Sequence, residues 1–228
     1  MKKLTAISLT TCAIAAITAC GGGGGGSTNS SSPTTYAVDT AYTQAATAGI
    51  SLNGTAIDGA DTWTMALSIT PAADETFEGA TAKKSVNAIT IKKNGTTVLS
   101  SGGESFFSIN PFKTKGLKLN DGHYGVATVA GSAMSNAAIV GNSGSLGTVT
   151  VYSNASKSTI SFTQEATWTL EEDTATTAYA CTNTTARDTN GTLITTTSGC
   201  YKIDPSGTIK GMRYALFVAA AGKTLVFR

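Results

Sequence analysis

The segment "TWTMALSIT" (residues 62–70) decides the fold class of this chain. Every second residue from Trp63 to Ile69 is large and apolar, and the residues between them are small or carry a hydroxyl group. Successive side chains of a strand point to opposite faces of a sheet, so this alternation predicts a strand with one buried face.

Shorter alternations of the same kind recur along the rest of the chain, separated by turn signals. The Asn-Gly pairs at residues 94–95 and 190–191 tolerate the positive φ angles that tight hairpins need. Many short strands joined by such turns are typical of an all-β protein, and we expect an antiparallel β-sandwich or barrel.

Two segments predict short helices that would add little to the β fold. Residues 39–49 offer Asp39 or Thr40 as an N-cap and Gly49 as a C-cap. Residues 132–141 are framed in the same way by Ser132 and Gly141.

The chain begins "MKKLTAISLTTCAIAAITAC" (residues 1–20), with two lysines, an apolar stretch and then small residues. This order predicts a secretory signal peptide over residues 1–19, with cleavage beside Cys20. The apolar stretch is shorter than the roughly 20 residues that a permanent membrane-spanning helix needs.

Residues 17–20, "ITAC", resemble the lipobox of bacterial lipoproteins. The resemblance implies that Cys20 carries a diacylglycerol and an acylated amine, which would anchor the protein in a membrane through its acyl chains. Several chains are needed because one alone binds a bilayer only marginally. Those lipoproteins tend to remain at the inner membrane when Asp follows the cysteine, so Gly21 favours the outer membrane.

Residues 20–35 contain six glycines and a run of small polar residues, which predicts a flexible tether. Residues 36–228 are long enough for one well-buried β domain. A weak internal repeat leaves two similar halves open, about residues 49–130 and 146–228, since each contains Thr-Trp-Thr followed by an Asn-Gly turn.

The charge balance argues against nucleic acid as a partner. The formal net charge is +2, and removal of residues 1–19 takes away two lysines, which leaves no net charge to neutralise phosphates. Lysines are frequent over residues 83–118 and acidic residues over residues 165–173. We interpret both stretches as solvated strand faces and turns, with an anionic-ligand patch on the lysines as the alternative.

Cysteine usage predicts one disulfide bond in the mature domain. Cys12 leaves with the signal peptide and Cys20 takes the lipid, so Cys181 and Cys200 remain as a pair in an oxidising compartment. A metal site or redox pair is disfavoured because the chain has no C-x-x-C spacing and only one histidine.

No constellation of residues predicts catalysis, a metal or a cofactor. His123, the single histidine, lies in "NDGHYG", where a turn is expected. Consecutive acidic residues at 171–173 point to opposite faces, and Asp58 and Asp61 lack the spacing of a calcium loop. The aromatic segment "FFSINPF" (residues 106–112) is expected to pack in the core, with a ligand pocket as the alternative.

These observations predict a non-enzymatic, lipid-anchored β domain at the outer membrane, on its periplasmic face or at the cell surface. It would bind a protein or glycan partner as an adhesin, receptor or envelope component. One alternative is an inhibitor of an envelope-attacking enzyme, because "SGCYK" (residues 198–202) resembles the Ser-Gly-x-x-Tyr loop of small lipoprotein lysozyme inhibitors. Another is a small-molecule carrier, which would need an apolar cavity inside a barrel.

Overall fold

The computed structural model describes residues 33–218 and 222–228. The predicted signal peptide, the predicted lipidation site at Cys20 and most of the predicted tether therefore lie outside the described residues. Residues 33–35, the end of the expected tether, are exposed and belong to no helix or strand.

Twelve strands and one helix make up the described chain, which confirms the all-β prediction. The elements are α1 (Val38–Ala48), β1 (Ile50–Asp58), β2 (Asp61–Phe77), β3 (Ala80–Lys93), β4 (Thr96–Ser108), β5 (Lys113–Leu119), β6 (Tyr124–Ala130), β7 (Ser143–Tyr152), β8 (Ile160–Thr174), β9 (Thr177–Asp188), β10 (Leu193–Ile203), β11 (Ile209–Val218) and β12 (Lys223–Phe227). The segment at residues 62–70 forms part of β2, as its alternation predicts.

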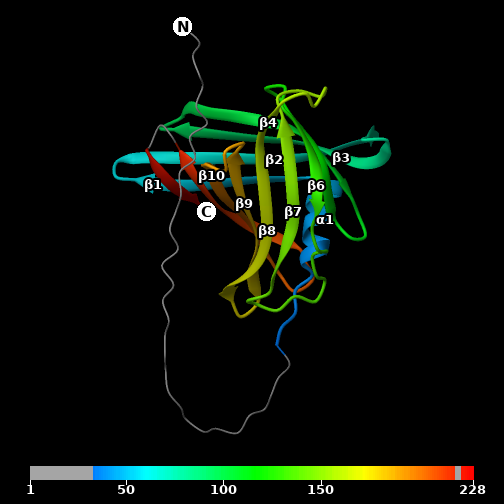
Figure 1. Ribbon diagram of the computed structural model, residues 1–228. Coiled ribbons are helices and arrows are strands. Elements are labelled where there is room, and N and C mark those ends of the chain that lie inside the picture. Colours follow the sequence, from blue (N-terminus) through cyan, green and yellow to red (C-terminus); the bar gives the residue numbers. More distant parts are fainter. Residues whose placement is uncertain (1–32, 219–221) are drawn as a thin grey trace.

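Every strand pairs antiparallel with the next one along the chain, so the sheet is a simple up-and-down meander. The sheet curls until β1 approaches β12, where the backbones of Thr55 and Arg228 exchange two hydrogen bonds of 2.9 and 3.2 Å. In Figure 1, β2 and β3 run across the view whereas β7 and β8 run along it, which displays this strong curl. Of the two architectures expected, the structure is a nearly closed barrel.

The concave face of the sheet, which we call the lumen face, carries two hydrophobic clusters. One lies between the first and last strands and surrounds Trp63, Met65 and Ile91. The other surrounds Trp168 and Leu170 on β8 and includes residues of α1. Because eight strands already give an interior that side chains can just fill, twelve strands leave room between the two clusters.

Helix α1 lies inside the curve of the sheet and fills one part of the lumen (Figure 1). The Tyr42 hydroxyl donates to the carbonyl of Ala180 at 3.2 Å and accepts from Thr182 at 2.7 Å. The Tyr42 ring also packs edge-on against Tyr201, with ring centres 5.1 Å apart. The helix is therefore fixed to the lumen face of β9 and β10.

The first predicted helix is confirmed and the second is wrong. Gly49 ends α1 with a φ of +82°, but Asp39 caps no helical amide and instead accepts from the Phe112 backbone at 2.8 Å. Residues 132–141 form no helix. Their backbone groups bind the segment before α1, since Ala138 pairs with Tyr36, and these hydrogen bonds replace helical ones.

The Asn-Gly pairs form the expected turns, between β3 and β4 and between β9 and β10. The two predicted halves correspond to six strands each within one continuous sheet. Trp63 and Trp168 occupy the second strand of each half, and both are buried on the lumen face. Internal duplication remains a prediction.

Candidate functional site

The strand pairing is shortest between β5 and β6. Only three residue pairs join these strands: Gly116 with Val126, Leu117 with Gly125, and Lys118 with Tyr124. Beyond Gly116, residues 113–115 of β5 pair only with β4, and residues 127–130 of β6 pair only with β7. Two strand edges therefore face each other without pairing.

A cavity of about 460 Å³ occupies this opening, which we call the β5–β6 gap. Its lining combines apolar side chains with lysines at the mouth, and includes Phe77, Phe112, Val126, Val129, Leu146, Lys113 and Lys115. Val129 is 57% exposed. An apolar gap between two unpaired strand edges is a template for pairing with another chain.

On the convex face, the tip of the β2–β3 hairpin covers the end of the gap where the β5–β6 pairing stops. Phe77 stacks on Phe106 and Tyr124, with ring centres 4.3 and 5.3 Å away. A Cβ atom on Gly116 would lie 2.4 Å from the Phe77 ring and 2.2 Å from the carbonyl of Gly125. Glycine at residue 116 is therefore what allows the hairpin and β6 to approach β5.

Glu78, also on this hairpin tip, connects it to two distant elements. It accepts hydrogen bonds from the Tyr124 hydroxyl at 2.7 Å and from the Lys157 ammonium at 2.6 Å. These bonds, first that of Lys157 and then that of Tyr124, lower the pKa of the Glu78 carboxyl. Burial, together with the bond to Glu78, raises the pKa of Tyr124.

An ionic network lies beside the gap on the convex face. Glu75 accepts from Lys118 and from Lys84, both at 2.7 Å, and Lys84 also lies 3.3 Å from Glu104. The hydrogen bond from Lys118, followed by that from Lys84, lowers the pKa of Glu75 to about 2. The Lys118 ammonium sits 4.8 Å from the centre of the Phe106 ring.

Most lysines of residues 83–118 form ion pairs with carboxylates. Lys83 binds Asp74 at 2.8 Å and Lys93 binds Asp61 at 2.7 Å. Lys115 donates to the carbonyl of Thr81 at 2.9 Å, while Lys113 is exposed at the gap. No continuous anion-binding patch follows from these contacts: of the lysines without a carboxylate partner among the described residues 83–118, Lys113 and Lys115 lie at the gap and Lys92 is exposed elsewhere on β3.

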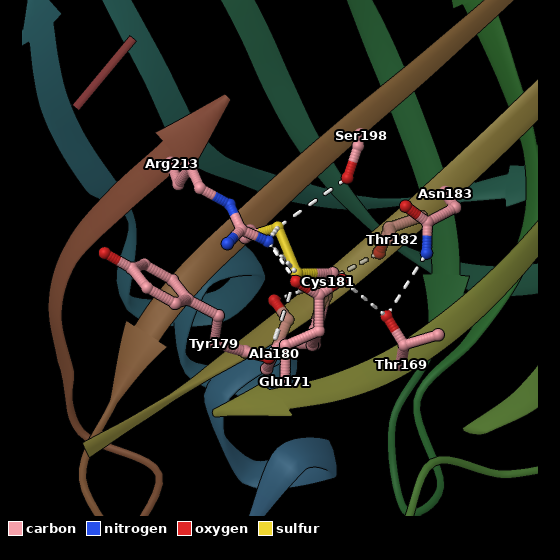
Figure 2. The surroundings of a disulfide bond; sticks show 11 residues. Thr169, Glu171, Tyr179, Ala180, Cys181, Thr182, Asn183, Ser198 and Arg213 are labelled. Atoms are coloured by element: carbon pink, nitrogen blue, oxygen red, sulfur yellow. Dashed lines mark hydrogen bonds and ion pairs between the residues drawn. A yellow bond between two sulfur atoms is a disulfide. The ribbon is translucent and has the colours of Figure 1, made fainter. Parts of the chain in front are cut away.

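The predicted disulfide between Cys181 and Cys200 is present, with the sulfur atoms 2.14 Å apart. The two cysteines face each other on neighbouring strands β9 and β10, and both are buried on the convex face. Figure 2 shows Arg213 over the disulfide, with its guanidinium 3.4 and 3.3 Å from the two sulfur atoms. The guanidinium lies 4.6 Å from the Tyr179 ring centre and pairs with Glu171. This arrangement shields the disulfide from solvent.

The residues considered for catalysis or metal binding do not converge. His123 lies in the turn before β6, with Nδ1 2.9 Å from Asp121. Asp58 pairs with Lys223 at the β1–β2 hairpin. The acidic run also disperses, since Asp173 binds Lys202 at 2.8 Å. Across the described ranges, no three His, Cys, Asp or Glu residues gather as a metal site requires.

The segment "SGCYK" lies within β10, which pairs with β9 on one side and β11 on the other. In the lysozyme inhibitors that it resembles, the corresponding residues form a loop. A fully paired strand does not present its backbone to a partner in that way, so the geometry that the resemblance implies is absent at this segment.

The aromatic segment divides between the two expected roles. Phe106 and Phe107 are buried, as core packing predicts. Phe112 is half-buried and lines the β5–β6 gap, where it contacts the rings of Phe107 and Tyr42.

Comparisons with known proteins give no relative for this chain. No family model, no curated protein and no solved structure matches it. In the part of the chain that the structure describes, no helix is long and apolar enough to cross a bilayer.

Sequence reasoning missed the β5–β6 gap. The one available signal was glycine inside two strands, Gly116 and Gly125, because glycine in a strand often marks a place where another backbone or side chain approaches closely.

Proposed function

We propose that this protein is a non-enzymatic, lipid-anchored envelope protein whose β domain binds a partner protein through the β5–β6 gap. The partner contributes an extended, acidic segment that pairs with the free edge of β6. The observation that carries this proposal is the end of β5–β6 pairing after three residue pairs.

Backbone chemistry supports a protein partner. Residues 127–130 of β6 have backbone groups with no strand on the gap side. An extended peptide satisfies such groups by adding a strand, while pockets beside the edge accept alternate side chains. Val129 and the apolar lining of the cavity offer such a surface.

Charge supports an acidic segment. Lys113 and Lys115 lie at the gap, and the only carboxylate that the described residues contribute to its lining, Glu78, is already paired with Lys157. Acidic side chains on an incoming strand would meet these lysines, which favours encounter and fixes the register of pairing.

A synthetic peptide tests this site directly. A twelve-residue peptide that alternates Val or Thr with Glu should bind the full chain and slow amide hydrogen exchange at residues 127–130. Lys113→Glu combined with Lys115→Glu should weaken binding about tenfold or more, while Lys92→Glu, an exposed lysine on β3, should not. Binding without new protection in β6, or equal loss in the Lys92 variant, would reject the proposal.

Membrane anchoring has its own test. Cys20→Ala should move the protein from the membrane fraction to the soluble fraction, because the acyl chains would have no attachment site. Protease treatment of intact cells, compared with opened cells, then distinguishes the cell surface from the periplasmic face. Retention of the Cys20 variant in the membrane fraction would contradict lipid anchoring.

A further inference from the structure

The lumen contains unfilled space that is separate from the β5–β6 gap. Two cavities of about 220 and 230 Å³ lie between the hydrophobic clusters, and both are lined by Leu67, Asn87 and Tyr214. Because they share these residues, they adjoin. Together they reach the size of small-molecule sites, which is roughly 300 to 1,000 Å³.

One part of this space is lined by apolar side chains that are incompletely packed. Leu67 and Ile69 on β2, Ile89 on β3, and Leu117 and Leu119 on β5 all line the cavities and remain half-buried. Apolar side chains facing an unfilled space forgo dispersion contacts that another apolar body would restore.

The opposite part of the lining carries hydroxyl groups. It consists of Thr182, Thr184, Thr197, Tyr42, Tyr201 and Tyr214. Burial raises the pKa of all three tyrosines, so their hydroxyls stay neutral under physiological conditions. This side of the lumen can therefore donate and accept hydrogen bonds without offering charge.

Small residues keep the space open. Strand β4 presents Ser101, Gly103 and Ser105 to one cavity, and β10 presents Gly199 to the other. A Cβ atom on Gly199 would lie 2.8 Å from the Tyr214 ring, so only glycine permits this ring position. Helix α1 does not fill the remainder, because Tyr42 is held against Ala180 and Thr182.

Among the residues that the structure describes, Glu104 is the one charged group in the lining. The Glu104 carboxylate is paired with Lys84 and Lys118. A charged ligand would lose its hydration in this space without meeting an opposite charge, which is costly.

We propose that the lumen binds an uncharged small molecule with an apolar body and a hydrogen-bonding group. The apolar part lies against Leu67, Ile89 and Leu117, and the polar group reaches the hydroxyls of β9 to β11. This site stands on residues other than those of the β5–β6 gap, so it does not depend on the partner-binding proposal.

A matched pair of fluorescent probes tests the proposal. N-phenyl-1-naphthylamine is uncharged, and 8-anilino-1-naphthalenesulfonate has the same ring system with an added sulfonate. The full chain carrying Cys20→Ala, which removes the predicted lipid site, should bind the uncharged probe saturably. Its affinity for the sulfonate should be lower by about tenfold or more.

Neighbouring threonines on opposite faces provide matched variants. Thr184→Phe and Thr197→Phe fill the lumen, and each should reduce affinity for the uncharged probe about tenfold. Thr185→Phe and Thr196→Phe place the same ring on the convex face and should leave affinity unchanged. Far-ultraviolet circular dichroism verifies that all four variants fold.

Two outcomes would overturn the lumen site. In the first, the folded lumen variants bind the uncharged probe with unchanged affinity, which would place the probe elsewhere. The other is no saturable binding of either probe, which would leave a lumen filled by water alone.

Discussion

The seams β9–β10 and β5–β6 show two ways of holding neighbouring strands in one sheet. Ten residue pairs join β9 to β10, with the disulfide between Cys181 and Cys200 near the middle. Three pairs join β5 to β6, and the Phe77 ring of the β2–β3 hairpin covers them, stacked on Phe106 and Tyr124. Backbone pairing and a covalent bond secure the first seam, whereas side-chain packing secures the second. The barrel wall is therefore easiest to open where packing replaces pairing.

Removal of the Phe77 ring should produce the largest effect. Phe77→Ala leaves a hole between Phe106, Tyr124 and Gly116, and large-to-small changes of this kind cost about 3–5 kcal/mol of unfolding free energy. Urea denaturation measures this loss of unfolding free energy. The rates of amide hydrogen exchange should increase more at β5 and β6 than at β9 and β10. Val86→Ala, at an exposed position, should change stability by less than about 0.5 kcal/mol. Uniform acceleration across both seams would remove the distinction between them.

Removal of the disulfide should weaken the other seam. The combined variant Cys181→Ala and Cys200→Ala should lose about 3 kcal/mol, the value expected for a closed loop of about 20 residues. Urea denaturation with and without a thiol reductant provides the measurement. The reductant should lower the stability of the parent protein and leave the double variant unchanged; an equal effect on both would mean that the bond is not the source of the stability.

Gly116→Ala should destabilise the protein by crowding the β5–β6 seam. The added methyl group would meet the Gly125 carbonyl and the Phe77 ring, and overpacking of this kind costs about 1–3 kcal/mol. Thermal unfolding can be compared with that of Gly211→Ala on β11, where an added Cβ atom meets nothing within 4 Å. If both variants melted at the same temperature, close approach at Gly116 would not be what holds β5 to β6.

The ionic network beside the gap should give the smallest effect and a defined pH dependence. The pKa of Glu75 is lowered from 4.5 to about 2 in the folded protein by Lys118 and Lys84. A lowered folded-state pKa stabilises the protein above the unfolded value, and this contribution disappears as the pH falls from about 4.5 towards 2. Glu75→Gln should therefore flatten the loss of stability over that range, as measured by urea denaturation at successive pH values. An unchanged slope would show that the network adds nothing to folding.

Much of the fold was predictable because its signals are local. Alternating apolar residues mark β2, the Asn-Gly pairs mark two turns, and Gly49 marks the end of α1. The pairing of Cys181 with Cys200 followed from cysteine count and compartment. The inferences on β2, the turns and α1 need only a few neighbouring residues, and the disulfide needs only the cysteines of the chain and the expected compartment.

The β5–β6 gap was not predictable because its cause is not local. Both strands have ordinary strand sequences, "KTKGLKL" and "YGVATVA". Neither sequence shows where the pairing stops, and the ring that covers the paired part, Phe77, approaches Gly116 from a distant hairpin. The helix predicted at residues 132–141 is absent for a similar reason: a distant residue, Tyr36, supplies backbone hydrogen bonds that replace helical ones.

The order of the strands has a consequence for how this chain folds. All eleven pairings between successive strands join sequence neighbours, so each hairpin can form with a small entropy of loop closure. Contacts between elements far apart in the chain are different: α1 must be enclosed by β8, β9 and β10, the tip of the β2–β3 hairpin must reach Tyr124 and Lys157, and Thr55 must meet Arg228. Contacts between residues far apart in sequence slow folding. We therefore expect the hairpins to form early, and docking of the helix and closure of the barrel to be the slow steps.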